Sequence, residues 1–188
     1  KLVKEGIKTV IIGRPNVGKS SLLNALLRED KAIVTNIAGT TRDIVEGSIS
    51  IDGVVLNMID TAGIRETDDI IESMGVEKSK ELIHQADLVL LVIDGSQSLS
   101  SEDMQLLELT EDATRIIVLN KADQGTKVDL DGIVISAKDN QISTLTEEIK
   151  KMFELGKIID NNDHILTNAR QTMLLQRASQ ALKLSLIH

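Results

Sequence analysis

One run near the start of the chain, GRPNVGKS from Gly13 to Ser20, has residue types and spacing suited to holding phosphate groups. Its glycines allow a tight backbone turn whose N–H groups point at phosphate oxygens, and Lys19 can reach the β- and γ-phosphates of a nucleotide. The hydroxyl group of Ser20 can take a coordination position on Mg²⁺. The pattern G-x-x-x-x-G-K-S therefore predicts a nucleotide-phosphate site.

Two later segments indicate which nucleotide is bound. Asp60 opens the sequence DTAG, where its carboxylate can hold Mg²⁺ through water and Gly63 can bring a backbone N–H close to the γ-phosphate. Asp123 closes the sequence NKAD and can accept both N–H groups on the guanine edge, which adenine does not offer. Asn120 and Lys121 are expected to shape and cover the base pocket. Together with the first run, these segments predict a guanine nucleotide-binding domain.

A fourth segment, SAK from Ser136 to Lys138, follows a further apolar run. It is expected to add a backbone N–H to guanine O6. The triplet by itself could be an ordinary loop, so this assignment depends on the other three segments.

The residue that would orient the attacking water is not evident from the pattern. In Ras-like proteins a glutamine directly after the glycine of D-x-x-G orients that water. Here the position holds Ile64, which cannot do so. Another residue must take the role, or the domain hydrolyses nucleotide poorly by itself. The stretch that follows supplies candidates, although the same residues could simply form a solvated face: Arg65, Glu66, Asp68, Asp69 and Glu72.

Apolar and helical patterns alternate along the chain and define the elements that must position these residues. Short apolar runs predict strands over residues 9–12, 48–51, 54–59, 88–93, 115–119 and 132–135. Periodic apolar patterns predict helices over residues 21–27, 70–85, 101–109 and 142–153. Asp52 and Gly53 favour a two-residue hairpin turn, so one strand is expected to run antiparallel to the others. The polar stretch 28–46 is expected to be a long mobile loop of a nucleotide switch.

Wholly apolar strands between helices are typical of a mostly parallel sheet covered on both faces. We therefore predict an α/β domain of the P-loop GTPase (Ras-like) type, with three layers, a six-stranded sheet and one antiparallel strand. Ligands of such sheets bind at the carboxyl ends of the strands. The loops that start at Gly13, Asp60, Asn120 and Ser136 are all expected to lie there and to converge on one ligand.

The character of the chain changes after residue 156. We predict a GTP-binding domain over residues 1–156 and a fragment of a helical domain over residues 157–188. Residues 158–164 are polar and are expected to be irregular, and Thr167 or Asn168 could begin a C-terminal helical tail. Because the sequence starts at Lys1 and not at a methionine, we expect a piece of a longer protein. Four apolar residues of the tail fall on one stripe, which is typical of a packing surface: Leu175, Ala178, Leu182 and Leu186.

The composition argues against several other classes of protein. The 188 residues carry a formal charge of −8, from 29 acidic and 21 basic residues, and Phe153 is the only aromatic residue. Nucleic-acid binding normally uses a basic surface and often stacking aromatic side chains, so the chain is not expected to hold RNA or DNA by itself. Without cysteine it has neither disulfides nor cysteine zinc sites, and its three histidines lack metal-binding spacing. No apolar run approaches the ~20 residues of a membrane span, so no membrane association is expected.

Several of these segments resemble a known family. GRPNVGKS, then IAGTTRD over residues 37–43, then DTAG look like the TrmE/Era/Der group of translation-associated GTPases. IRETDD and ESMGVE within residues 64–77, and LTNARQ over residues 166–171, resemble the bacterial tRNA-modification GTPases of the MnmE or TrmE family. The resemblance covers nearly the whole chain. The folate-binding domain and the cysteine-bearing segment of that family are absent from it.

The resemblance implies roles for specific residues. It assigns a K⁺ site beside the phosphates to Asn16 and to a loop that closes over the ion: Thr35, Ile37 and Thr40. It assigns Mg²⁺ to Ser20, Asp60 and Thr41, of which Thr41 also senses the γ-phosphate. It gives the water-orienting role to Glu72, so that the catalytic residues would be Glu72, Lys19 and Thr41. A physical reason supports the K⁺ ion, because a cation between the phosphates offsets charge that develops in the transition state.

Motifs and resemblance together predict the nucleotide site, with GTP or GDP, Mg²⁺ and K⁺ as its cofactors. The resemblance also implies a cytoplasmic homodimer formed through the switch faces of two such domains, a flavoprotein partner, and tRNA contact only through regions absent from this chain. The residues predicted to contact the nucleotide are Asn16, Val17, Gly18, Lys19, Ser20, Ser21, Thr35, Ile37, Thr40, Thr41, Asp60, Gly63, Asn120, Lys121, Asp123, Ser136, Ala137 and Lys138.

Two other functions stay open at this point. Ribosome-assembly GTPases of the Der or Era type share the first loop and the TTRD segment, but they would not explain residues 167–171. A nucleotide-dependent binding module with incidental hydrolysis would show slow turnover that K⁺ and dimerisation do not change. Asp123 disfavours a plain ATPase.

Overall fold

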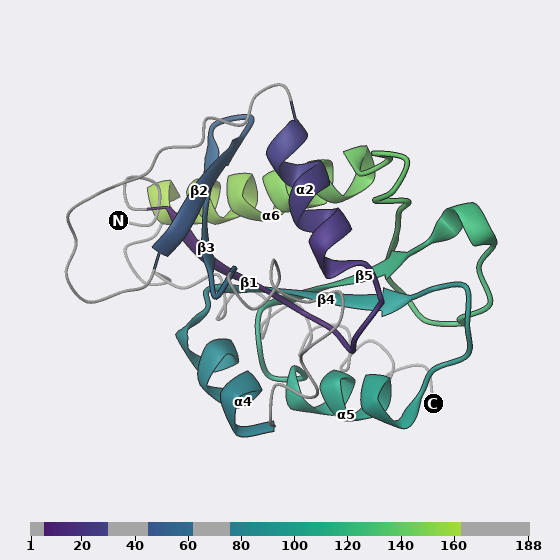
Figure 1. Ribbon diagram of the computed structural model, residues 1–188. Coiled ribbons are helices and arrows are strands. Elements are labelled where there is room, and N and C mark those ends of the chain that lie inside the picture. Colours follow the sequence, from purple (N-terminus) through teal and green to yellow (C-terminus); the bar gives the residue numbers. More distant parts are fainter. Residues whose placement is uncertain (1–5, 30–44, 62–75, 163–188) are drawn as a thin grey trace, which may run out of the picture. The chain divides into compact units, whose positions relative to one another are not determined.

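The computed structural model describes residues 6–29, 45–61 and 76–162 (Figure 1). The chain divides into two compact units, Lys1–Glu147 and Glu148–His188. All strands and the candidate site belong to the first unit. The predicted boundary at residues 156 and 157 stays a prediction.

A six-stranded sheet forms the centre of the first unit, in the strand order β2-β3-β1-β4-β5-β6. The pairs β1–β3, β1–β4, β4–β5 and β5–β6 are parallel, and only β2–β3 is antiparallel. The predicted six-stranded, mostly parallel sheet with one antiparallel strand is therefore confirmed. The strands are β1 Ile7–Ile12, β2 Val45–Ile51, β3 Val54–Ile59, β4 Leu88–Asp94, β5 Arg115–Asn120 and β6 Ile133–Val134.

Helices lie on both faces of this sheet, as Figure 1 shows for α2 on one face and α4 and α5 on the other. Every residue of β4 is buried, because a central parallel strand has side chains to pack on both sides. The three-layer arrangement is therefore confirmed. The helices are α2 Lys19–Arg28, α4 Val76–Gln85, α5 Ser101–Leu109, α6 Ser143–Asn162 and the short 3₁₀ helix η1 Ala122–Gln124. One core cluster, between the sheet and the helices of one face, consists of Val10, Ile12, Ile59, Leu82, Val89, Leu91, Ile93 and Leu119.

The hairpin between β2 and β3 has the turn that its sequence predicts. Asp52 and Gly53 have φ angles of 49° and 89°, which is the left-handed region that a two-residue type I′ turn requires at both positions. The turn pairs Ile51 with Val54 and continues into an antiparallel ladder. The hairpin fixes the end of β3, and hence the place of Asp60.

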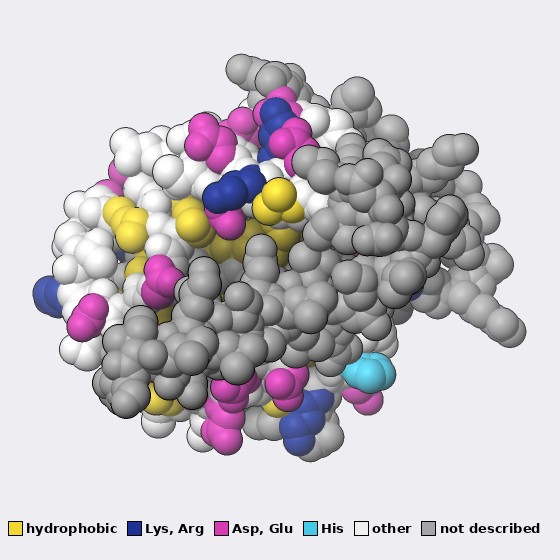
Figure 2. Space-filling view, turned by 180° about the vertical axis from the view of Figure 1, so that it is seen from behind, with side chains coloured by type: hydrophobic (Ala, Val, Ile, Leu, Met, Phe, Trp, Pro, Cys, Tyr) yellow, Lys and Arg dark blue, Asp and Glu magenta, His cyan; other side chains and the backbone are white. Residues whose placement is uncertain are grey.

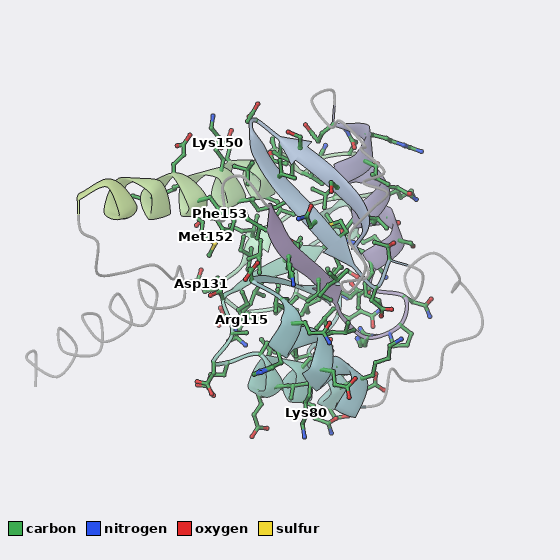
Figure 3. The ribbon with its side chains drawn as sticks, turned by 90° about the vertical axis from the view of Figure 1, so that its left-hand side faces the viewer. Lys80, Arg115, Asp131, Lys150, Met152 and Phe153 are labelled. Carbon is green, nitrogen blue, oxygen red and sulfur yellow. The ribbon has the colours of Figure 1, made fainter. Side chains whose placement is uncertain are left out.

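Helix α5 is held at both ends. At its start, Ser100 and Asp103 form a reciprocal capping box in which each side chain accepts the other's backbone N–H. At its end lies Arg115, which is labelled in Figure 3. Its guanidinium donates to Thr110 Oγ1 at 2.7 Å and to the backbone oxygen of Leu107. Since Arg115 is the first residue of β5, these bonds tie the end of the helix to the sheet.

The structure corrects one helix boundary. Helix α6 was expected to end at residue 153, with an irregular segment from residue 158, but it continues to Asn162. Gly156 costs only about 1 kcal/mol inside a helix, and no proline follows to end it, so a single glycine does not stop the helix. The rest of the predicted tail and most of the switch loop lie outside the described residues, and α4 is described only from Val76.

None of the described helices is both long enough and apolar enough to cross a membrane. On the described part of the face in Figure 2, acidic side chains alternate with a few lysine and arginine side chains and do not leave a broad basic patch. That distribution agrees with the acidic composition.

Candidate nucleotide-binding site

The loops after β1, β4, β5 and β6 meet at the carboxyl end of the sheet, and Asn120 joins two of them. Its side-chain amide donates to the backbone oxygen of Val17 at 2.9 Å, and its Oδ1 accepts the backbone N–H of Ala137 at 3.0 Å. Asn120 is 3% exposed, so both bonds are shielded from water. The last residue of β5 thereby links the loop after β1 to the loop after β6.

The first loop, residues 13–18, is shaped by two close approaches that only glycine allows. A Cβ atom at Gly13 would lie 2.5 Å from the backbone oxygen of Val92. Gly18 has a φ of 96°, and a Cβ atom there would lie 2.3 Å from Asn120 Nδ2. Asn16 also has a left-handed φ, of 63°, and is exposed to solvent. The loop therefore winds tightly around the start of α2, as a phosphate-binding backbone must.

Lys19, the first residue of α2, folds back over this loop. Its Nζ donates to the backbone oxygens of Gly13 at 2.7 Å and Arg14 at 2.8 Å. Burial lowers the pKa of Lys19 from 10.5 to about 8. Burial removes water that would otherwise stabilise the ammonium charge, and a neighbouring anion would stabilise it instead. The position therefore favours the binding of an anion.

Asp60 follows β3 and presents an oxygen suited to a cation. Its φ is 56°, and its Oδ2 is buried with no hydrogen-bond donor within the described residues. Lys78 Nζ lies 3.4 Å from that oxygen as an ion pair without hydrogen-bond geometry. A buried carboxylate oxygen without a donor fits an Mg²⁺ role, directly or through water. In the described ranges, no group of three or more His, Asp or Glu side chains could hold a metal ion.

The turn after β5 carries the base-reading residues. Lys121 has a φ of 68° and caps η1, which contains Asp123. Asp123 is exposed, and its Oδ1 lies 3.1 Å from Ser136 Oγ, so the loops after β5 and β6 also meet through side chains. An exposed carboxylate beside a tight turn is free to accept hydrogen bonds from a base. Lys138, two residues after Ser136, is also exposed.

Three ties at this end of the sheet were not predicted from the sequence. Lys121 Nζ lies 2.7 Å from Asp94 Oδ2, and Arg14 Nε lies 3.1 Å from Asp103 Oδ2. Asp94 also accepts the hydroxyl of Ser96 at 2.6 Å. Burial by itself raises the pKa of Asp94, but the hydrogen bonds from Lys121 and Ser96 outweigh it, and the pKa lies below its ordinary value. One of these contacts had a signal in the sequence: Asp94 is a charged residue at the end of an otherwise apolar strand, which indicates that a partner for its charge lies nearby.

Several predicted residues come together here, and others cannot be placed. Val17 is buried, and Ser20 and Ser21 are half-buried in the first turn of α2. The predicted site residues that lie outside the described residues are Thr35, Ile37, Thr40, Thr41, Gly63 and Glu72, together with the other water-orienting candidates Arg65, Glu66, Asp68 and Asp69.

Comparison with known proteins agrees with this geometry. The chain is 53% identical over 189 residues to the tRNA modification GTPase MnmE of Lactococcus lactis subsp. cremoris (strain SK11), a match that covers 97% of this chain and 42% of the relative. It is 53% identical over 190 residues to the MnmE of Streptococcus gordonii, with the same coverage of 97% and 42%. The chain thus spans about two fifths of the length of the curated relatives it matches.

A solved structure is also similar. A variant of Aquifex aeolicus Era bound to GDP and aluminium fluoride matches with a TM-score of 0.53 and 26% identity, over 79% of this chain and 56% of that chain. The family model for 50S ribosome-binding GTPases matches residues 8–121, which is more than half of the chain. The match includes the loops after β1 and β3 and ends at Lys121, the first residue after β5. The chain therefore belongs to the 50S ribosome-binding GTPase family.

Proposed function

We propose that this chain is the GTP-binding and GTP-hydrolysing domain of a tRNA-modification protein. The observation that carries the proposal is the Asn120 side chain, which fastens the phosphate loop through Val17 and the base loop through Ala137. This arrangement supports a single site that would hold the phosphates and the base together. The 53% identity to MnmE over 97% of the chain supports the choice among GTPases.

Asp123 would select guanine. Its carboxylate is exposed at the turn that follows β5, where it can accept the two N–H groups of a guanine edge. Adenine offers no matching pair of donors, so a site built around this carboxylate rejects it. Lys121 would cover the base with its methylene groups, and the segment from Ser136 to Lys138 would add one backbone N–H to guanine O6. Because the Ala137 N–H is already donated to Asn120 Oδ1, the N–H of Lys138 is the candidate.

Two cations would complete the phosphate site. Ser20 and Asp60 would hold Mg²⁺, helped by Thr41, and the Oδ2 of Asp60, which accepts no hydrogen bond from the described residues, supports that role. Asn16 would hold K⁺ beside the phosphates, with Thr35, Ile37 and Thr40 in the switch loop, and its exposed position in the phosphate loop is consistent with this. When bound, the ions neutralise charge that develops on the phosphates.

Hydrolysis would require residues from both switches. Lys19 would bind the β- and γ-phosphates, Thr41 would sense the γ-phosphate, and Glu72 would orient the attacking water in place of Ile64. We propose that two copies of the domain meet through their switch faces and activate each other. The whole protein would act in the cytoplasm with a flavoprotein partner on the wobble uridine of tRNA, which it would contact through regions outside this chain.

The nucleotide assignment can be tested by changing the base-reading carboxylate. For the unmodified chain, GDP should displace a fluorescent GDP analogue at far lower concentration than ADP. Asp123→Asn should weaken GDP and strengthen xanthosine diphosphate, because an amide donor matches the extra carbonyl of xanthine. Asp129→Asn, an exposed aspartate farther along the same loop, serves as the matched control and should leave both affinities unchanged. Equal affinity of the unmodified chain for GDP and ADP would refute the proposal.

The tRNA assignment requires the whole gene. Mass spectrometry of tRNA from cells with and without that gene should show loss of a modification at the wobble uridine. A second candidate, a ribosome-assembly GTPase, has some support from the family description and from the similarity to Era. Unchanged wobble uridines together with accumulated ribosomal precursors would favour that candidate.

A further inference from the structure

A buried carboxylate lies under the base-reading turn and has no part in the proposed nucleotide contacts. Asp94, the last residue of β4, is 2% exposed. Its Oδ1 accepts the backbone N–H of Ser96 at 3.0 Å and the Ser96 hydroxyl at 2.6 Å, and its Oδ2 lies 2.7 Å from Lys121 Nζ. Both oxygens are therefore engaged, one with its own loop and the other with the neighbouring loop.

The loop that follows Asp94 is fastened to the base-reading turn by its backbone as well. Gly95 N donates to the oxygen of Asn120 at 2.8 Å, and Lys127 N donates to the oxygen of Gly95 at 2.7 Å. A Cβ atom at Gly95 would lie 3.1 Å from that same Asn120 oxygen, so the two strand ends are in close contact. These two bonds hold both ends of the segment 120–127 against the loop that follows β4.

Lys121 itself has a backbone conformation that needs support. Its φ of 68° is left-handed, and a non-glycine residue stays in that region only when its surroundings over-determine it. From there the Lys121 oxygen accepts the N–H of Gln124 at 2.9 Å, which closes η1 around Asp123. The ion pair to Asp94 fixes the far end of the same side chain.

We infer that Asp94 is a positioning residue for guanine recognition: by pairing with Lys121 it holds the turn that aims the Asp123 carboxylate at the base. The inference rests on the proposed guanine nucleotide binding. Asp94 does not touch the nucleotide, and it acts through Lys121. An ionised carboxylate is required, since a neutral amide would leave the half-buried ammonium without a counter-charge.

The test compares the affinity for GDP with that for ADP. Asp94→Asn should raise the Kd for GDP about tenfold by misplacing Asp123 and should change the Kd for ADP little, because adenine does not pair with that carboxylate. General damage to the fold would weaken both nucleotides equally. Asp103→Asn is the matched control, since Asp103 is equally buried and ion-paired but lies on α5, so any effect should fall on both nucleotides alike.

A double-mutant cycle then tests the route. In a Lys121→Met background, Asp94→Asn should add almost nothing to the Kd for GDP, because its partner is already gone. If Asp94→Asn does not fold, Ser96→Ala removes one hydrogen bond to the same carboxylate and should give a smaller, GDP-selective loss, of about threefold.

The outcomes separate the two proposals. Absence of GDP preference in the unmodified chain would refute the proposed function. Clear GDP preference in the unmodified chain, with an unchanged GDP-to-ADP ratio in Asp94→Asn and Ser96→Ala, would overturn the role of Asp94 alone. A full effect of Asp94→Asn in the Lys121→Met background would also overturn it.

Discussion

Binding of GDP should take up a proton through Lys19 at mildly alkaline pH. In the nucleotide-free protein, burial lowers the pKa of Lys19 to about 8, so part of the population has a neutral amine there. A diphosphate beside the amine stabilises the charged form and raises the pKa again. Binding and protonation are therefore linked, and affinity must fall as the pH rises through the pKa of the free protein.

The size of the effect follows from that pKa. If bound GDP returns the pKa of Lys19 from about 8 to its ordinary value of 10.5, the uptake per GDP is about 0.1 proton at pH 7, 0.5 at pH 8 and 0.9 at pH 9. The Kd for GDP should accordingly rise about tenfold between pH 7 and pH 9, which corresponds to about 1.4 kcal/mol. The phosphate groups of GDP contribute little above pH 7.5, because their second pKa is about 6.

Calorimetry measures this uptake directly. Titrations with GDP at pH 8 in two buffers of different ionisation enthalpy give the number of protons bound from the difference in heat. Lys19→Arg provides the control, because a guanidinium stays charged throughout this range and should show no uptake. Uptake below about 0.1 proton at pH 8 in the unmodified chain, or equal uptake in Lys19→Arg, would refute the reasoning.

Three further predictions concern other parts of the site. Gly18→Ala should abolish nucleotide binding and lower the free energy of unfolding, measured by chemical denaturation, by about 2–3 kcal/mol. The reason is that backbone strain at φ 96° adds to a contact of 2.3 Å between the new Cβ atom and Asn120 Nδ2. The control is Gly53→Ala, at φ 89° with nothing within 4 Å, which should lower the free energy of unfolding by only about 1–2 kcal/mol and leave binding intact. Asn16→Ala should remove a K⁺ stimulation of GTP hydrolysis of roughly 10²-fold, measured as phosphate release in K⁺ against Na⁺, and full stimulation in that variant would place the ion elsewhere. Glu72→Ala should lower kcat by about 10²- to 10³-fold while GDP affinity and dimerisation with GDP–aluminium fluoride, followed by light scattering, stay nearly normal; Glu81→Ala on α4 is the control, and normal turnover in Glu72→Ala would return the acidic stretch to a solvated face.

Local patterns were sufficient to predict most of the fold. Helix α5 has the predicted bounds, residues 101–109, because a serine cap and an acidic third position mark its start. The hairpin at Asp52 and Gly53 was equally readable, since few other dipeptides accept two left-handed residues. Apolar runs of four to six residues located all six strands, and only their ends moved by a few residues.

The contacts between loops were not readable in the same way. The pairing of Lys121 with Asp94 depends on β5 lying next to β4, and strand order is not encoded in the periodicity of either strand. The same holds for Arg14 and Asp103, which are 89 positions apart. The 3₁₀ turn after β5 was also missed, because three residues are too few to show a period.

The hydrogen bond from Asn120 to the Val17 carbonyl spans 103 positions of the chain, and this separation orders events while the protein is being made. The phosphate loop is synthesised early, but the amide that holds it belongs to the last residue of β5. Contacts across such a distance form late, because a long stretch of chain must first be closed. A nascent chain is therefore not expected to bind a nucleotide until β4 and β5 have joined the sheet. From that moment the nucleotide, by binding only the folded form, shifts the folding equilibrium toward completion.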